Sequence, residues 1–410
     1  MKRCATWMVV ALLLAPWASW ASLKSLPPFT VSACLGVNIH FIEPQGNELE
    51  QIHAAGFGMV RMDFVWERVE RVKGTYDFSG YQRLTESLGR LGMTPIYILD
   101  YSHSGYEPHH SVTTEEGRRA FARFAAAAVK AMGDAPIIWE IWNEPNLKQF
   151  WEDQPSVRDY VLLVEAAVTA MRAVDPDCTV VAPATSGIPM SFLEGCFDLG
   201  LLQWIDAVSV HPYREKPPES ALPDYESLRA LIQRYATQKT IPILSGEWGF
   251  SLHRYRNLEV TEHRQAQFVA RQFLTNLLAG VRVSIWYDWH DDGTDPNERE
   301  HNFGIVKHDY QKKEAYVAAQ VLMEQLQGMK FVKRLDAGVP EDYLVLFAKG
   351  NQRVLAAWTT GEPHTFALKG MPVRVDAVSM LGAKVLLKKS DQGMMLPLSE
   401  DPLYVTLREK

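Results

Sequence analysis

The sequence predicts an α/β fold: a (β/α)8 barrel over residues 30–328, followed by a small antiparallel β-sandwich-like domain over residues 329–410. Up to residue 328, short apolar runs alternate with longer amphipathic segments, which is typical of β/α units around a parallel sheet. After Gly328 the runs are short and closely spaced, with turn residues between them, which indicates antiparallel strands.

Each barrel unit has a recognisable strand. The eight predicted strands are 34–40, 59–63, 94–101, 136–142, 179–184, 205–211, 241–247 and 281–287. The clearest predicted helices are 115–132, 157–174, 261–279 and 310–327. Such a barrel needs roughly 250 residues, which residues 30–328 supply. The strands predicted for the C-terminal domain are 331–335, 343–348, 353–358, 365–368, 373–378 and 403–407. We expect this domain to support the barrel from the side.

Composition narrows the class of partner. The chain of 410 residues is 47% hydrophobic and has a formal net charge of −7, so it lacks the basic footprint of a nucleic-acid-binding protein. Its 12 tryptophans either stack on sugar rings or fill the core. The sequence leaves the oligomeric state open.

The first 21 residues have the pattern of a secretory signal peptide. A positive start, Met1-Lys2-Arg3, precedes an apolar stretch over residues 7–14 and small residues up to Ala21. We therefore expect export to the periplasm or the medium, which N-terminal sequencing of the mature protein would test. The apolar stretch is too short to span a bilayer, so stable membrane insertion is not expected.

Cysteine and acidic residues give no metal-site pattern. Cys4 would leave with the signal, and Cys34, Cys178 and Cys196 are an odd number that cannot all pair. Cys178 and Cys196 either form a disulfide or are free buried thiols. The acidic loop 288–301 lacks the spacing of an EF-hand, and no Cys/His spacing indicates zinc. We expect neither a metal nor a cofactor.

Two glutamates follow predicted strands. Glu144 comes directly after Asn143 beyond the fourth strand, and Glu247 ends the seventh. Either segment alone is compatible with an ordinary turn. Together they lie at the end of the barrel where enzymes of this architecture carry their chemistry. A pair of carboxyl groups there suits glycosidic bond cleavage.

Other strand ends supply the rest of a candidate site. Arg61 on a buried strand either pairs with a carboxylate to satisfy its burial or keeps a nucleophile ionised. The residues at or just beyond the strand ends are His40, Arg61, Asp63, Tyr101, His103, Trp142, Asn143, Glu144, His211, Tyr213, Glu247, Trp248, Trp286, Tyr287 and Asp288.

Four motifs resemble those of the retaining glycoside hydrolases of clan A. They are Trp-Asn-Glu-Pro at 142–145, His-Pro-Tyr at 211–213, Gly-Glu-Trp at 246–248 and Trp-Tyr-Asp-Trp at 286–289. Val-Arg-Met-Asp at 60–63, with Trp66, and Gly-Thr-Tyr-Asp-Phe at 74–78 strengthen the similarity to family 39 and its relatives from bacterial exopolysaccharide gene clusters. The resemblance covers residues 30–328.

The resemblance implies a role for each matching residue. Glu144 would be the general acid/base, Glu247 the nucleophile and Asn143 a donor to the sugar 2-hydroxyl group. Arg61 and Tyr213 would orient the nucleophile. The residues expected to shape the sugar site are His211, Trp248, Trp286, His40 and Tyr287.

The implied partner is a carbohydrate polymer or oligosaccharide, cleaved internally or from an end. Two alternatives use the same fold: a transglycosylase with the same two glutamates, and a non-catalytic polysaccharide-binding protein. A metal-dependent hydrolase is disfavoured because Asn38-Ile39-His40 offers only one histidine. The sequence does not indicate which sugar is bound.

Overall fold

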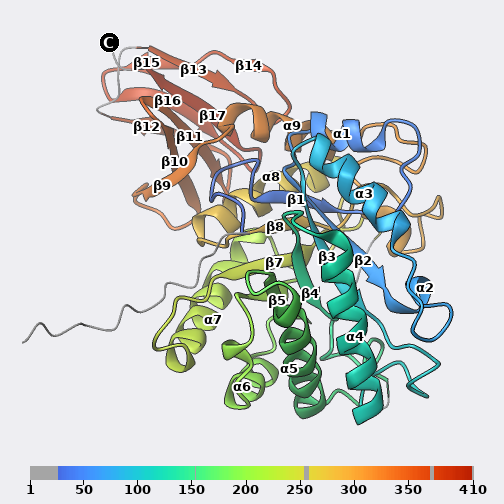
Figure 1. The fold of residues 1–410 in the computed structure, drawn as a ribbon. Helices are drawn as coiled ribbons and strands as arrows, with labels where there is room; N and C mark the ends of the chain where they lie inside the picture. The colour runs from blue at the N-terminus through green and yellow to red at the C-terminus, as the bar shows by residue number, and fades with distance from the viewer. Residues whose placement is uncertain (1–25, 153, 254–257, 370–373, 409–410) are drawn as a thin grey trace, which may run out of the picture.

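The computed structural model describes residues 26–152, 154–253, 258–369 and 374–408 (Figure 1). The predicted signal peptide, residues 1–21, lies outside the described residues, so it stays a prediction. Among the described helices, none combines the length and the apolar character needed to cross a membrane.

Eight parallel strands close into a barrel in sequence order, which confirms the predicted fold class. They are β1 (Leu35–Asn38), β2 (Met59–Val65), β3 (Thr94–Asp100), β4 (Ile138–Ile141), β5 (Thr179–Ser186), β6 (Ala207–His211), β7 (Ile243–Trp248) and β8 (Ser284–Trp286). The surrounding helices are α1 (Glu48–Ala54), α2 (Trp66–Val69), α3 (Ser79–Arg90), α4 (Glu115–Met132), α5 (Val157–Val174), α6 (Met190–Asp198), α7 (Leu222–Tyr235), α8 (Glu262–Leu278) and α9 (Glu314–Leu326). Short 3-10 turns lie at η1 (Leu201–Gln203), η2 (Pro218–Ala221) and η3 (Glu300–Asn302).

Side-chain caps fix where three of these helices begin. The hydroxyl groups of Thr114, Ser156 and Thr261 accept hydrogen bonds from backbone N–H groups in the first turns of α4, α5 and α8. Such caps satisfy amides that have no partner inside the helix. Thr261 is therefore the cap of α8 and not its first residue, which explains the one-residue difference from the predicted start.

The interior of the barrel changes from apolar to polar along the strands. Near the strand starts it is filled by a separate apolar cluster that includes Met59, Ile96 and Ile138. Two residues further on, β2 and β4 carry Arg61 and Glu140, both fully buried. Because side chains alternate along a strand, these residues point inward as Met59 and Ile138 do. The polar upper interior forms the floor of the candidate site.

The C-terminal domain is antiparallel, as predicted. One sheet has the strand order β14-β13-β17-β11-β10-β9 and the other β12-β16-β15. Six strands match predicted runs: β9 (Lys330–Leu335), β10 (Asp342–Lys349), β11 (Gln352–Thr359), β12 (His364–Leu368), β13 (Arg374–Val378) and β17 (Leu403–Arg408). The sequence analysis missed β14 (Lys384–Val385), β15 (Lys388–Ser390) and β16 (Gly393–Leu398). The first two are short and rich in lysine, and Pro397 interrupts the strand pattern of the third.

The three described cysteines are buried free thiols, so Cys178 and Cys196 do not form the disulfide that the sequence left open. Burial raises the pKa of the Cys34 thiol and that of Cys178, in each case to about 12. Such thiols remain protonated and unreactive at neutral pH.

The C-terminal domain packs beside the barrel (Figure 1), and the indole of Trp358 reaches a buried ion pair of the barrel domain. Arg271 of α8 donates from Nε and Nη2 to the two carboxylate oxygens of Glu219 in η2, at 2.7 and 2.8 Å. The indole N–H of Trp358, on β11, donates to the same carboxylate at 2.7 Å. The C-terminal domain therefore supports the segment that follows β6. His211 is the last residue of β6, and Tyr213 lies in the segment after it.

This contact generates a stability prediction. Glu219→Ala would leave Arg271 buried without its partner, so we expect a loss of about 3–5 kcal/mol in the free energy of unfolding. Glu226→Ala, on the exposed face of α7, is the matched control and should change this free energy by less than about 0.5 kcal/mol. Urea unfolding measures both, and equal midpoints for the two variants would contradict the assignment.

Candidate active site

A cavity of about 450 Å³ opens at the C-terminal ends of the barrel strands. Seven of the ten predicted site residues line it: His40, Arg61, Asn143, Glu144, Tyr213, Glu247 and Tyr287. His211 is fully buried and contacts Glu144 from within the protein. Trp248 and Trp286 do not line the cavity. The structure thus brings together eight of the ten residues.

The two glutamates face each other across this cavity. A carboxyl oxygen of Glu144 and one of Glu247 lie within 4.8 Å of each other. Retaining glycosidases hold their two carboxyl groups about 5–5.5 Å apart, whereas inverting enzymes need about 6.5–9.5 Å for an intervening water. The spacing is therefore that of a retaining pair.

The chain makes an unusual turn to place Glu144. Trp142 and Glu144 both have left-handed backbone conformations, with φ of 67° and 47°. Non-glycine residues adopt this region at a cost, and they do so most often at functional sites. Backbone hydrogen bonds from Trp142 N to Leu99 O and from Glu144 N to Ala184 O anchor the turn to β3 and β5. The turn lets Glu144 reach the cavity from beyond the end of β4.

Two donors hold Glu247. Arg61 donates from Nη1 to Oε2 at 2.6 Å, and the Tyr213 hydroxyl group donates to Oε1 at 2.7 Å. Burial and the neighbouring Glu247 raise the pKa of Tyr213 well above its usual range, so the phenol keeps the proton that it donates. One donor to each oxygen fixes the orientation of an anionic carboxylate.

Arg61 is held in turn by Glu140, whose Oε2 accepts from Nε at 2.6 Å. The site prediction omitted Glu140. The sequence signal that could have indicated Glu140 is an acidic residue inside an otherwise apolar buried strand. Gly246 makes room for this pair, because a Cβ atom there would lie 3.0 Å from Glu140 Oε1 and closer still to Ser209 Oγ.

Arg61 also determines the tautomer of His211. Its Nη2 lies 3.2 Å from His211 Nε2, and a guanidinium group can only donate. The imidazole proton is therefore on Nδ1, which lies 3.0 Å from Glu144 Oε1. Burial lowers the pKa of His211 to about 4, so the ring is neutral at pH 7. Neutral His211 thus separates the Arg61 cation from Glu144, and it donates one hydrogen bond to Glu144.

Glu144 has the opposite environment from Glu247. Burial raises its pKa to about 7 and outweighs the opposing influence of Arg61. A general acid works best when its pKa lies close to the working pH. The same cavity therefore contains one carboxyl group bound by two donors and one whose burial favours the protonated form.

The expectation that Trp248 and Trp286 shape the sugar site by contact is wrong. Both rings are fully buried in the layer between the barrel and its helices. Trp248 follows Glu247 in β7, and consecutive side chains of a strand point to opposite faces, so the ring turns away from the cavity. The aromatic residues that do line the cavity are Tyr101, Phe150, Tyr213, Tyr287 and Phe303.

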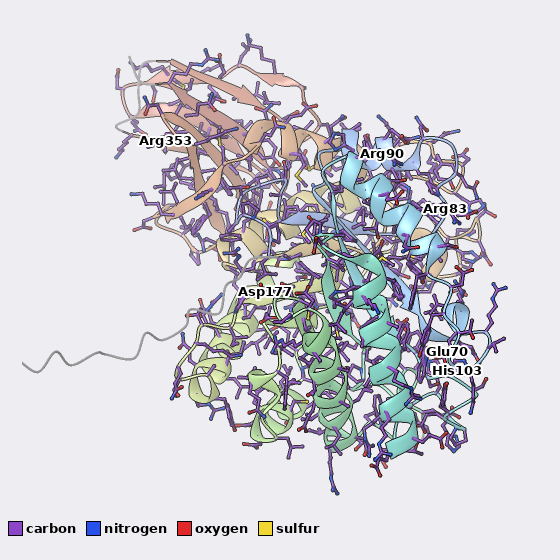
Figure 2. All side chains as sticks on the ribbon, in the orientation of Figure 1. Glu70, Arg83, Arg90, His103, Asp177 and Arg353 are labelled. Atoms are coloured by element: carbon purple, nitrogen blue, oxygen red, sulfur yellow. The ribbon has the colours of Figure 1, made fainter. Side chains whose placement is uncertain are left out.

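His103 follows β3 and also stays outside the cavity. Figure 2 labels it next to Glu70, and its Nε2 donates to the Glu70 backbone oxygen at 2.6 Å. Its Nδ1 accepts from Gly105 N, so both ring nitrogens are used within the protein. His103 therefore connects the segment after α2 to the loop after β3.

Two groups of described residues have the spacing of a metal site. They are His40 with Asp288 and Asp292, and Glu144 with His211 and Glu247. In the second group Arg61 already supplies a positive charge 2.6 Å from Glu247. In this group the carboxyl group of Glu247 is thus already paired with a guanidinium.

The closed barrel, with one glutamate beyond β4 and one on β7, has the architecture of the glycoside hydrolases of clan A. A family model described as cellulase (glycosyl hydrolase family 5) matches residues 29–293, more than half of the chain. The chain belongs to this family.

Similar structures come from neighbouring families. A family 39 glycoside hydrolase from Bacteroides cellulosilyticus WH2 superimposes with a TM-score of 0.81 at 25% identity, over 92% of this chain and 81% of that one. A family 39 β-xylosidase from Caulobacter crescentus has the same fold, with a TM-score of 0.67 at 17% identity over 94% of this chain and 98% of that one. These likenesses agree with the clan A resemblance of the sequence motifs.

A β-xylosidase from Geobacillus stearothermophilus is 32% identical over 118 residues. This alignment covers 24% of the present chain and 23% of the relative, so the chain aligns with less than a quarter of that enzyme.

The burial of Trp248 predicts the effect of its removal. Trp248→Ala should lower the free energy of unfolding by about 3–5 kcal/mol, because a large cavity would form in a packed layer. Phe150→Ala removes a half-buried ring that lines the site, so it should weaken substrate use and leave the melting temperature almost unchanged. Calorimetry with kinetics separates the two effects. A Trp248→Ala variant with normal melting and poor substrate use would restore the role of Trp248 in the sugar site.

The pKa of Glu144 predicts the pH dependence of bond cleavage. Only the protonated form donates to the leaving oxygen, so kcat/KM should fall about tenfold per pH unit above pH 7. On an aryl glycoside whose leaving group still benefits from protonation, the wild type should show this alkaline limb and the residual kcat/KM of Glu144→Gln should lack it. Initial rates between pH 5 and 9 test this, and an alkaline limb that persists in Glu144→Gln would assign it to another group.

Proposed function

We propose that the protein hydrolyses O-glycosidic bonds of a polysaccharide or oligosaccharide by double displacement. Glu247 acts as the nucleophile and Glu144 as the general acid/base. The observation that carries this proposal is the pair of carboxyl oxygens within 4.8 Å, one group bound by two donors and the other with a pKa near 7.

In the first step Glu247 attacks the anomeric carbon while Glu144 protonates the leaving oxygen. The orientation of Glu247 by Arg61 and Tyr213 supports this role, because each carboxylate oxygen is held by one donor. The product is a glycosyl ester on Glu247, and Glu144 is left ionised.

In the second step Glu144 takes a proton from water, which attacks the same carbon and releases Glu247. His211 donates to Glu144 from Nδ1, so it stabilises the carboxylate in this half of the cycle. The anomeric configuration is retained after two inversions.

Cleavage within a chain is supported by a second cavity of about 690 Å³. It shares Tyr213, Arg299 and Phe303 with the first, so the two cavities adjoin. Together they have room for more than one sugar unit. Two of the similar proteins are named β-xylosidases, which favours β-linked substrates. A transglycosylase would use the same two steps with a sugar hydroxyl group in place of water.

Removal of each glutamate tests the proposal. Glu247→Ala should abolish activity on aryl β-glycosides, whereas Glu144→Ala should keep more activity when the leaving group is activated. Azide should partly rescue Glu144→Ala and give a β-glycosyl azide, because it enters from the face that water uses. Glu226→Ala is the control and should match the wild type.

Proton NMR of the first product distinguishes the stereochemical outcomes. The initial product should be the β anomer. An initial α anomer, or full activity in Glu247→Ala, would overturn the proposed mechanism. Full substrate binding with no turnover in the wild type would favour a polysaccharide-binding protein instead.

A further inference from the structure

A second pair of carboxyl groups, Asp63 and Asp100, lies at the mouth of the barrel. Asp63 is on β2, two residues after Arg61, and its half-buried side chain lines the cavity. Asp100 is the last residue of β3 and is fully buried. The proposed mechanism uses neither residue, so their place in the cavity requires another explanation.

The two carboxyl groups differ in their burial. Burial, together with the neighbouring carboxyl group of Asp63, raises the pKa of Asp100 well above its usual range, which favours its neutral form. Asp63 is only half-buried and presents its carboxyl group to the cavity.

The cations around the cavity are already paired. Arg61 lies between Glu140 and Glu247, each at 2.6 Å. Arg299 contacts Glu300 at 3.0 Å. None of these pairs leaves a net positive charge for an anionic ligand.

His40 adds no net positive charge in either protonation state. Burial opposes its ionisation, as does the amide Nδ2 of Asn38, which lies 3.0 Å from Nε2. Asp292 and Asp288 oppose these influences and raise its pKa to about 9. Whichever form is present, Nδ1 lies 3.0 Å from Asp292 Oδ1, so His40 and Asp292 together are at most neutral.

Asp63 lies on the side of the cavity that receives the attacked sugar. Glu144, the proposed proton donor to the leaving group, lies in the segment after β4, as does Leu147. Ser186, at the end of the neighbouring strand β5, lines the same cavity. Asp63 stands on the wall formed by β1, β2 and β8, with His40 and Tyr287. With its anomeric carbon at Glu247 and its leaving group at Glu144, a bound sugar would have its ring on the side of the cavity that Asp63 lines.

We propose that Asp63 binds hydroxyl groups of this sugar and makes the site select an uncharged sugar over a uronic acid. The inference rests on the proposed function and adds the substrate class. A carboxylate is an acceptor-only group with two oxygens, which matches adjacent hydroxyl donors. A uronic acid would bring a second negative charge next to Asp63 in a partly enclosed site, where repulsion is stronger than in water.

The test uses 4-nitrophenyl β-D-xyloside, β-D-glucoside and β-D-glucuronide, with the 3-deoxy and 4-deoxy forms of the better uncharged substrate. The wild type should prefer an uncharged glycoside to the glucuronide by at least about 100-fold in kcat/KM. Asp63→Asn should lower kcat/KM on that glycoside by about 100-fold, the effect of losing hydrogen bonds to a charged group. The preference of Asp63→Asn for that glycoside over the glucuronide, measured as the ratio of kcat/KM values, should be at least tenfold smaller than that of the wild type.

The deoxy substrates identify the contact. If Asp63 binds the 3- or 4-hydroxyl group, the wild type loses about 100-fold on the matching deoxy substrate. Asp63→Asn should then change kcat/KM on that same substrate by less than about threefold, because the contact is already absent. Asp100→Asn preserves a neutral group of the same shape, so it is the matched control and should stay within about threefold of the wild type.

Each outcome has a distinct meaning. Normal kcat/KM in Asp63→Asn, with unchanged melting, overturns this inference alone, as does a wild type that prefers the glucuronide. A wild type that releases no nitrophenol from any uncharged substrate, like Glu247→Ala, overturns the proposed function and this inference with it. If Asp63→Asn fails to fold, the wild type alone still tests the contact. The contact is refuted if the wild-type kcat/KM falls by less than tenfold on both the 3-deoxy and the 4-deoxy substrate.

Discussion

The buried guanidinium of Arg61 is the constraint on which the site depends. It donates to Glu140, Glu247 and Asn143 and lies against His211, so one side chain organises groups from β4, β6 and β7. A charge this deeply buried is tolerated only when its hydrogen bonds are satisfied. The folding requirement and the proposed chemical requirement therefore coincide: the hydrogen bonds that make Arg61 tolerable in the core also orient Glu247, the proposed nucleophile.

The same side chain explains why two glutamates in one cavity behave differently. Glu247 receives its donor directly from Arg61, whereas Glu144 receives one only through the neutral imidazole of His211. The cation is thus close to one carboxyl group and separated from the other. Burial then dominates at Glu144 and favours its protonated form. Double displacement needs this asymmetry, because the nucleophile must begin ionised and the acid must begin protonated.

The sequence was sufficient for the barrel because each strand is a short apolar run with its own turn signals. It was also sufficient to place Glu144 and Glu247 at the mouth, since strand order alone determines which ends meet. It did not determine which face a strand-end side chain occupies. The register of β7 shifts against β8 between Ser245 and Trp248, so the side of Trp248 depends on a local irregularity that an apolar run does not encode. Contacts made across the barrel, such as Glu140 with Arg61, depend on the closed geometry in the same way.

One buried cation among several carboxyl groups sorts them into ionised and protonated forms. Glu140 and Glu247 contact Arg61 directly and share its charge. Asp100 has no hydrogen-bond partner at ordinary distance and angle in the described part of the chain, and burial, together with the neighbouring Asp63, raises its pKa well above the usual range. Asp63 lines the part of the cavity that is open to a sugar. A second buried cation near Asp100 or Glu144 would remove the distinction, because each group would lose its proton and the site would lose its general acid. The placement of Arg61, next to Glu140 and Glu247 and separated from Glu144 by His211, is therefore a chemical requirement of the proposed mechanism.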